Sequence, residues 1–212
     1  MKHFIISVVL SLLIGTSAFA QEAHTTNNTE SYAIGDIYSN GEVCGMVINT
    51  TDKGRHGTII SLDEACLRWS KQPRKMIKSC GATNKNDGRA NMEAIAAHIA
   101  AEGLSWSDFP AANWCKEHGK GWYLPAVNEV WLLGTVFCGG SRTSAKRHIS
   151  KTLNSILRAS GGRPLNNVMN YLSSTEHNNP RQCLYSHLNN NTPQMSDCGK
   201  EEELFIRAFY RF

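Results

Sequence analysis

Hydrophobic residues group into strand-like patterns near both ends of the chain and helix-like patterns in its middle. Alternating apolar residues from 43 to 48 meet a polar run of Asn, Thr, Asp and Gly at 49–54, and a second apolar run follows at 57–62. This pattern predicts an antiparallel hairpin. Further strand-like patterns come late in the chain, at residues 171–175, 183–188 and 204–212.

The middle of the chain carries four helical patterns, which cover residues 90–101, 110–118, 125–136 and 144–160. Gly103 stops the first, and the second is opened by Pro110 and closed by Gly119. Strands, then helices, then strands predict an α+β fold, because a doubly wound sheet would alternate the two kinds of element.

The last strand pattern alternates between two faces over residues 204–212. Arg207 and Arg211 fall on the same face, together with Phe205 and Phe209. We therefore expect both arginines to line a half-exposed face of a sheet.

Composition is that of an ordinary globular protein. The 212 residues are 41% hydrophobic and 19% charged, which excludes a collagen-like or wholly disordered chain. The formal net charge of +4 is spread along the chain without a dense basic block. No nucleic acid partner is expected, because a phosphate backbone demands clustered Lys and Arg.

The first twenty residues have the pattern of a secretory signal peptide. A basic start precedes an apolar run at 4–14, and an Ala-x-Ala pattern ends at Ala20. Cleavage would leave a mature chain from Gln21, with residues 21–31 as a flexible polar leader. The apolar run is too short to span a bilayer, so no membrane span is predicted, and no lipoprotein cysteine follows the cut. We expect a secreted, periplasmic or cell-surface protein.

Seven cysteines fall in the part of the chain that export would deliver to an oxidising compartment. Three disulfides with one thiol left over are expected, because seven is an odd number. Cys183 with Cys198 is the favoured pair, since these residues flank a polar loop whose base the bond would close. The same two cysteines and His187 would otherwise be zinc ligands, but oxidised cysteines cannot bind a metal. The sequence therefore predicts no metal site and no cofactor.

Another cysteine offers a catalytic alternative. Cys115 and His118 lie three residues apart on the second predicted helix, as a nucleophile and its base would. A disulfide cysteine beside a surface histidine explains the same spacing and is favoured.

Several motifs in the second half of the chain point to one family. Residues 109–115 read Phe-Pro-Ala-Ala-Asn-Trp-Cys, and residues 121–130 read Gly-Trp-Tyr-Leu-Pro-Ala-Val-Asn-Glu-Val. Residues 171–176 read Tyr-Leu-Ser-Ser-Thr-Glu, and residues 206–212 read Ile-Arg-Ala-Phe-Tyr-Arg-Phe. Together they resemble the bacterial Lcl C-terminal domain family, whose exported members are of unknown function. The resemblance implies a C-type-lectin-like fold, with an antiparallel sheet and flanking helices, as a single domain over residues 32–212.

The chain lacks motifs that carry activity in related folds. The Glu-Pro-Asn, Gln-Pro-Asp and Trp-Asn-Asp triplets of calcium-dependent lectins do not occur. The Arg-Leu-Pro-Thr-Glu motif of formylglycine-generating enzymes is replaced by Tyr-Leu-Pro-Ala-Val at 123–127. Trp122, Leu124 and Pro125 are expected to pack in the core, and Glu129 to lie at the positive end of a helix dipole.

These observations favour a non-enzymatic binding module that recognises an extracellular carbohydrate or another extracellular polymer, or a surface protein. The alternatives are an enzyme of the formylglycine-generating or Cys-dependent kind, and a protein-binding subunit of an adhesin. The expected ligand contacts combine amides, a guanidinium and an aromatic ring in one polar region. They are Glu176, His177, Asn178, Arg181, Tyr185, His187, Asn189 and Asn191.

Overall fold

The computed structural model describes residues 31–138, 144–166, 169–188 and 193–212. The predicted signal peptide at 1–20 and leader residues 21–30 lie outside the described residues. Asn189 and Asn191, two of the expected ligand contacts, also lie outside them.

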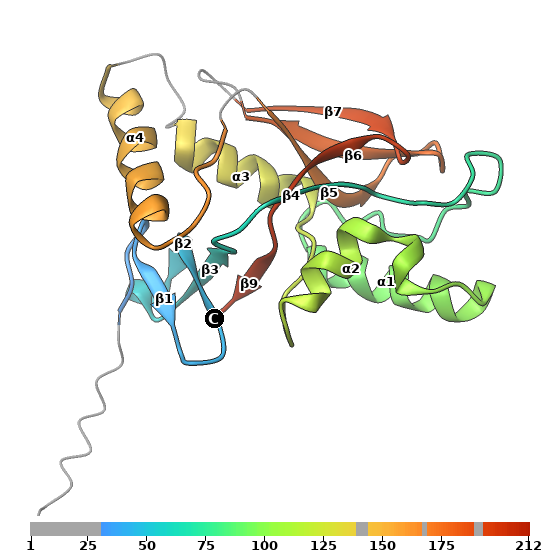
Figure 1. Ribbon diagram of the computed structural model, residues 1–212, viewed down its shortest axis with the longest axis horizontal. Coiled ribbons are helices and arrows are strands. Elements are labelled where there is room, and N and C mark those ends of the chain that lie inside the picture. The colour runs from blue at the N-terminus through green and yellow to red at the C-terminus, as the bar shows by residue number, and fades with distance from the viewer. Residues whose placement is uncertain (1–30, 139–143, 167–168, 189–192) are drawn as a thin grey trace, which may run out of the picture.

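Two mainly antiparallel sheets and four α-helices make up the described fold, which confirms the predicted α+β class (Figure 1). The smaller sheet has the order β1 (Ile37–Ser39), β2 (Cys44–Thr51), β3 (His56–Ile60), β9 (Phe209–Arg211). The larger sheet has the order β4 (Ala65–Arg68), β8 (Glu203–Ile206), β5 (Asn170–Glu176), β6 (Gln182–His187), β7 (Gln194–Gly199). The β2–β3 pair is the predicted hairpin, and β5 pairs with β8 in parallel.

The four helices lie where the apolar periodicity predicts them. They are α1 (Gly88–Glu102), α2 (Pro110–Glu117), α3 (Val127–Cys138) and α4 (Ser144–Ala159), with short 3-10 turns at Asp52–Gly54 and Trp106–Asp108. The Asp87 side chain caps α1 by accepting from Arg89 N, and Gly103 ends the helix at a φ of 65°. Pro110 occupies the first turn of α2, where its missing N–H costs no hydrogen bond.

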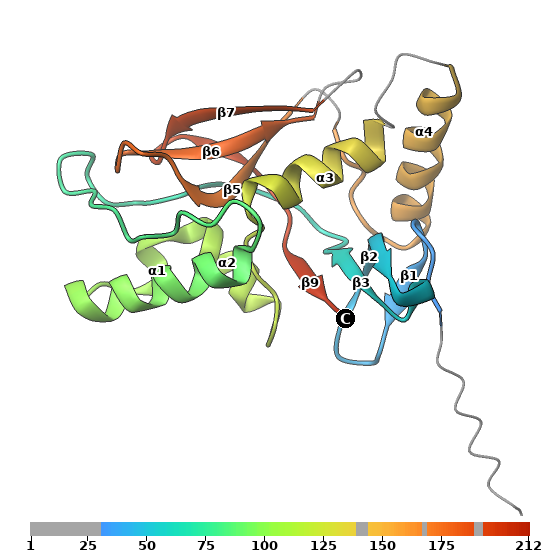
Figure 2. The ribbon, with the colours of Figure 1, turned by 180° about the vertical axis from the view of Figure 1, so that it is seen from behind.

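The helices fill the space around and between the two sheets. Helices α1 and α2 lie beneath the larger sheet, while α4 stands beside the smaller one, and Figure 2 shows the same arrangement from behind. Helix α3 runs between them and packs against β5, β6 and α4. The first turn of α3 therefore lies close to both sheets.

Two apolar clusters form the core. Trp122 and Leu124 lie in the first, together with Trp69 and Phe109, and they are 6% and 1% exposed. The second cluster joins the smaller sheet to α3 and α4 through residues such as Ile60. The expectation that Trp122 and Leu124 pack in the core is confirmed.

The end of the chain differs from the prediction. Residues 204–212 form two strands in different sheets, and the crossing from β8 to β9 lies at Arg207, which is buried. Its Nη1 donates to Ser61 O at 2.8 Å and Leu62 O at 3.1 Å, and its Nε lies 3.4 Å from Glu64 Oε2. The prediction of a half-exposed Arg207 is wrong, because the guanidinium satisfies carbonyl groups where the chain changes sheets. No helix within the described ranges is long and apolar enough to cross a membrane.

Candidate functional site

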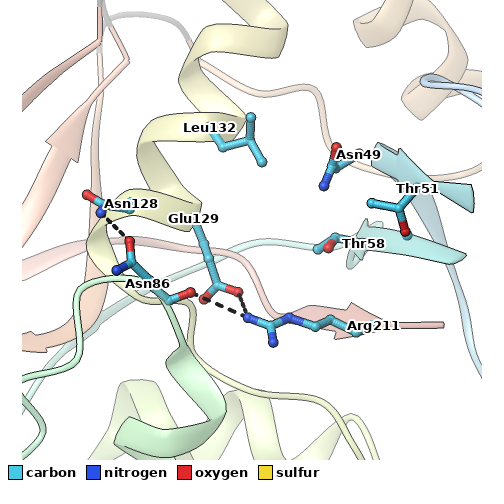
Figure 3. A pocket seen from close by; sticks show the side chains of 9 residues that line it. Asn49, Thr51, Thr58, Asn86, Asn128, Glu129, Leu132 and Arg211 are labelled. Carbon is cyan, nitrogen blue, oxygen red and sulfur yellow. Dashed lines mark hydrogen bonds and ion pairs between the residues drawn. The ribbon is translucent and has the colours of Figure 1, made fainter.

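A polar cleft of about 370 Å³ opens between the smaller sheet and the first turn of α3 (Figure 3). One wall is formed by strands β2, β3 and β9, and the other by α3 and the loop before α1. The cleft therefore lies where segments from both ends and the middle of the chain meet.

The sheet wall is a row of polar side chains set by strand register. Asn49 of β2 lies opposite Thr58 of β3, and Thr58 lies opposite Arg211 of β9. A bulge at Ile48 shifts the pairing, since the next pair along the hairpin joins Val47 to Ile59. Cross-strand neighbours of this kind are about 5 Å apart, so the row presents an amide, a hydroxyl and a guanidinium side by side.

Three side chains of this wall have hydrogen-bonding capacity that the protein leaves unused. Asn49, Thr51 and Thr58 line the cleft, and none of their side-chain groups bonds to another described residue. Asn49 and Thr51 are two residues apart on β2 and share a face of the sheet. Water or a ligand must satisfy these groups.

The helix wall is held by Glu129 in the first turn of α3. Its Oε2 accepts from Ala126 N at 2.8 Å and from Gly88 N at 3.0 Å, which joins the starts of α3 and α1. The expectation that Glu129 suits a helix N-terminus is confirmed. A side chain at Gly88 would not fit, because its Cβ would lie 2.4 Å from Leu124 O. Asn128 lines the cleft beside Glu129.

An ion pair crosses the cleft. Arg211 Nη2 lies 2.6 Å from Glu129 Oε1 and 3.3 Å from Asp87 Oδ1, and Arg211 Nε donates to Tyr123 Oη at 3.1 Å. Burial acts to lower the pKa of Arg211, but the hydrogen bond and charge of Glu129 outweigh it and raise the pKa. Burial, followed by the charge of Glu129, also raises the pKa of Tyr123. Both groups therefore keep their protons near neutral pH, which suits binding rather than proton transfer.

Glu176, an expected ligand contact, lies in the interior. Its side chain is fully buried in an ion pair with Lys200, whose side chain is also fully buried. The carboxylate also accepts from Ser79 Oγ at 2.7 Å, from Cys80 N at 3.0 Å and from Gly81 N at 3.0 Å. These partners occupy both oxygens, so Glu176 has no free surface for a ligand.

The other expected contacts within the described residues fall into separate places, between the β5–β6 turn and the far end of β6. His177, Asn178 and Arg181 lie at the β5–β6 turn, and Asn178 and Arg181 are exposed. Tyr185 is half-buried in mid-strand, and His187 at the far end contacts Asn170 Oδ1 through Nδ1 at 2.6 Å. Six residues of strand separate positions 181 and 187, a span of about 20 Å. The described residues of this set do not converge on one site.

The structure does not support a catalytic role for Cys115 with His118 as its base. Cys115 is fully buried, and burial raises the pKa of its thiol. His118 places Nε2 2.9 Å from Asp63 Oδ1 and Nδ1 2.9 Å from Trp114 O, rather than contacting the thiol. A protonated, inaccessible thiol is a poor nucleophile.

The favoured cysteine pair is adjacent in the β6–β7 hairpin. Cys183 lies directly opposite Cys198, with 3.7 Å between the two Sγ atoms of these buried thiols. The disulfide between them stays a prediction, as do the other expected disulfides. In the described part of the chain, no three His, Cys, Asp or Glu side chains gather to hold a metal ion.

Comparisons with known proteins bear on the fold. Neither protein-family models nor curated proteins give a match. Among solved structures, the chain is similar to a fimbrial protein from Bacteroides ovatus ATCC 8483, with a TM-score of 0.56 and 17% identity. The match covers 74% of this chain and 36% of the fimbrial protein, so the likeness concerns about a third of that protein. At this identity it supports the α+β fold alone.

Proposed function

We propose that this protein is an adhesin-like surface binding module whose polar cleft recognises neutral carbohydrate. The observation that carries the proposal is the sheet wall, where the side chains of Asn49, Thr51 and Thr58 keep free hydrogen-bonding groups. Amides and hydroxyls both donate and accept, as the hydroxyl groups of a sugar do. Asn128 supplies an amide oxygen from the opposite wall, since its Nδ2 already donates to Asn86 Oδ1.

The charges in the cleft favour a neutral ligand over an anionic one. The single guanidinium of Arg211 is balanced by Glu129 and Asp87, with separations of 2.6 and 3.3 Å. An incoming carboxylate or sulfate would meet two carboxylates around an arginine that is already paired. Like charges at this range oppose binding, and screening by salt is weaker in a partly buried site.

The surface location is supported by two separate observations. The structural neighbour is titled a fimbrial protein, and residues 1–20 of this chain have the pattern of a cleaved signal peptide. We extend the proposal to a C-type-lectin-like domain of the Lcl C-terminal kind over residues 32–212, on the motifs quoted above. If export proceeds as proposed, N-terminal sequencing of the secreted protein will begin near Gln21, and a retained Met1 would contradict it.

The hairpin offers a matched test of the cleft. Thr58→Val removes one hydroxyl from the sheet wall while keeping the shape of the side chain. Thr50→Val makes the same change on the opposite face of β2, because Thr50 alternates with Asn49 and Thr51. Loss of one hydrogen bond predicts about three- to tenfold weaker binding for Thr58→Val, and no change for Thr50→Val.

The assay is an array that carries neutral, sulfated and uronic acid glycans, followed by calorimetry on the best neutral ligand. Equal binding by the two variants, or wild-type binding confined to sulfated or uronic acid polymers, would overturn the proposal.

A further inference from the structure

We infer that the cleft selects sugars that carry an N-acetyl group, so that its ligands are N-acetylhexosamines rather than simple hexoses. The acetamido group of the ligand lies between Asn49 on the sheet wall and Leu132 on the helix wall. This inference rests on the proposed function and names the ligand class of the same cleft.

Asn49 and Leu132 lie at one end of the cleft, away from its ion pair. On the sheet wall, Asn49 is two strands away from Arg211, because Thr58 lies between them in the register. On the helix wall, Leu132 comes three residues after Glu129, which is nearly one turn. Figure 3 shows the side chains of Asn49 and Leu132 on opposite walls at this end of the cleft and the ion pair at the other end.

Leu132 gives this end of the cleft an apolar surface. Among the described residues that line the cleft, Leu132 alone has a purely hydrocarbon side chain. The side chain is half-buried and belongs to neither apolar cluster of the core. A methyl group of a ligand that covers it removes apolar surface of both partners from water, which favours binding.

Asn49 gives the same end an unused amide. Its side chain makes no hydrogen bond to another described residue. The amide nitrogen donates and the amide oxygen accepts. Asn49 Nδ2 therefore suits the carbonyl oxygen of an acetamido group, and Asn49 Oδ1 stays available for the hydroxyl on the neighbouring carbon of the sugar ring.

An N-acetylhexosamine matches both surfaces in one sugar unit. A simple hexose has the hydroxyl groups but no methyl group, and a 6-deoxy sugar has a methyl group but no carbonyl beside it. The acetamido group is also uncharged, as the paired charges of the cleft require. The volume of about 370 Å³ lies near the lower end of the range for ligand pockets, about 300–1,000 Å³, which suits a single unit.

The test compares sugars that differ only in this substituent. Methyl glycosides of glucose, galactose and mannose, each with its N-formyl and N-acetyl 2-amino derivatives, are titrated by NMR, which measures weak affinities. In the series that binds best, we expect the N-acetyl sugar to bind about tenfold more tightly than the hexose, with the N-formyl sugar between them. Leu132→Ala should abolish the difference between N-acetyl and N-formyl sugars, and Asn49→Ala the difference between N-formyl sugar and hexose.

Met76→Ala and Asn178→Ala are the matched controls, because both residues are exposed and neither lines the cleft, and they should leave all the ratios unchanged. Equal wild-type affinities for the three sugars of a series, or a preference that survives both Leu132→Ala and Asn49→Ala, would overturn the inference and leave the proposed function standing. Absence of binding to every neutral sugar, or normal binding by Thr58→Val, would overturn both. The wild-type comparison needs no variant, and melting temperatures establish that the variants are folded.

Discussion

The buried ion pair between Glu176 and Lys200 allows a quantitative test of the interior. Both side chains are fully buried, and Lys200 Nζ lies 4.0 Å from the ring centroid of Trp69. Lys200→Met keeps the length of the side chain but leaves the Glu176 carboxylate without its counter-charge. Breaking a buried pair from one side costs about 3–5 kcal/mol of unfolding free energy.

That loss predicts a fall in melting temperature of about 6–20 °C, because a chain of this size shifts about 2–4 °C per kcal/mol. Glu176→Gln should be similarly damaging, and the double variant should cost less than the sum of the two single changes. Urea denaturation and calorimetry measure these quantities. Lys116→Met is the control, since Lys116 is exposed and lies over Trp106 at 5.4 Å. Its loss should cost under about 1 kcal/mol.

The dependence of stability on pH provides a second test of the Glu176–Lys200 ion pair. Burial acts to raise the pKa of Glu176, but the ion pair with Lys200 and the surrounding hydrogen bonds outweigh it and lower the pKa. A carboxyl whose pKa is lower in the folded state stabilises the fold above its unfolded pKa, and this contribution disappears as pH falls through the folded pKa. The wild-type protein should therefore lose more stability than Glu176→Gln between pH 7 and about pH 3. An additive double variant with parallel pH profiles would refute the reasoning.

Three further predictions follow from the interior. Trp122→Ala should cost about 3–5 kcal/mol by leaving a cavity in the core, and normal melting with lost ligand binding would show that the ring serves the site instead. Arg207→Met should cost several kcal/mol because buried carbonyls lose their donor, whereas Arg68→Met, in an exposed ion pair, should cost under about 1 kcal/mol in the same urea titration. Peptide mapping of the oxidised protein should recover Cys183 joined to Cys198, a bond worth ~3 kcal/mol, and finding each in a different bridge would contradict the assignment.

Local patterns predict much of the fold because they depend on neighbouring residues. The Pro110 start of α2 and the Gly103 end of α1 follow from backbone preferences that operate wherever the residues occur. The split between β8 and β9 does not follow from its own sequence. Arg207 alternates correctly for a single strand, and its burial is favourable because of partners far away in the chain, namely the carbonyls of residues 61, 62 and 163 and the carboxylate of Glu64.

The cleft does not follow from the local sequence for a similar reason. Asn49 and Thr51 resemble turn residues in the sequence, but β2 continues through both of them. Their alignment with Thr58 and Arg211 depends on one bulge and on a strand from the far end of the chain. The sequence contains one signal for the cleft, since residues 49, 51 and 58 are polar and belong to one predicted hairpin. Conversely, the polar residues between 176 and 191 predict one site, although Glu176 is buried and the other described members lie between the β5–β6 turn and the far end of β6.

The most direct test of the account compares the cleft with the polar turn that the sequence favoured. One variant combines Asn49→Ala with Thr58→Val, and the other combines Asn178→Ala with Arg181→Ala at the exposed β5–β6 turn. Calorimetry with the best neutral glycan of the array measures both. The account predicts at least tenfold weaker binding for the cleft variant and unchanged binding for the turn variant. Full binding by the cleft variant together with loss in the turn variant would contradict it.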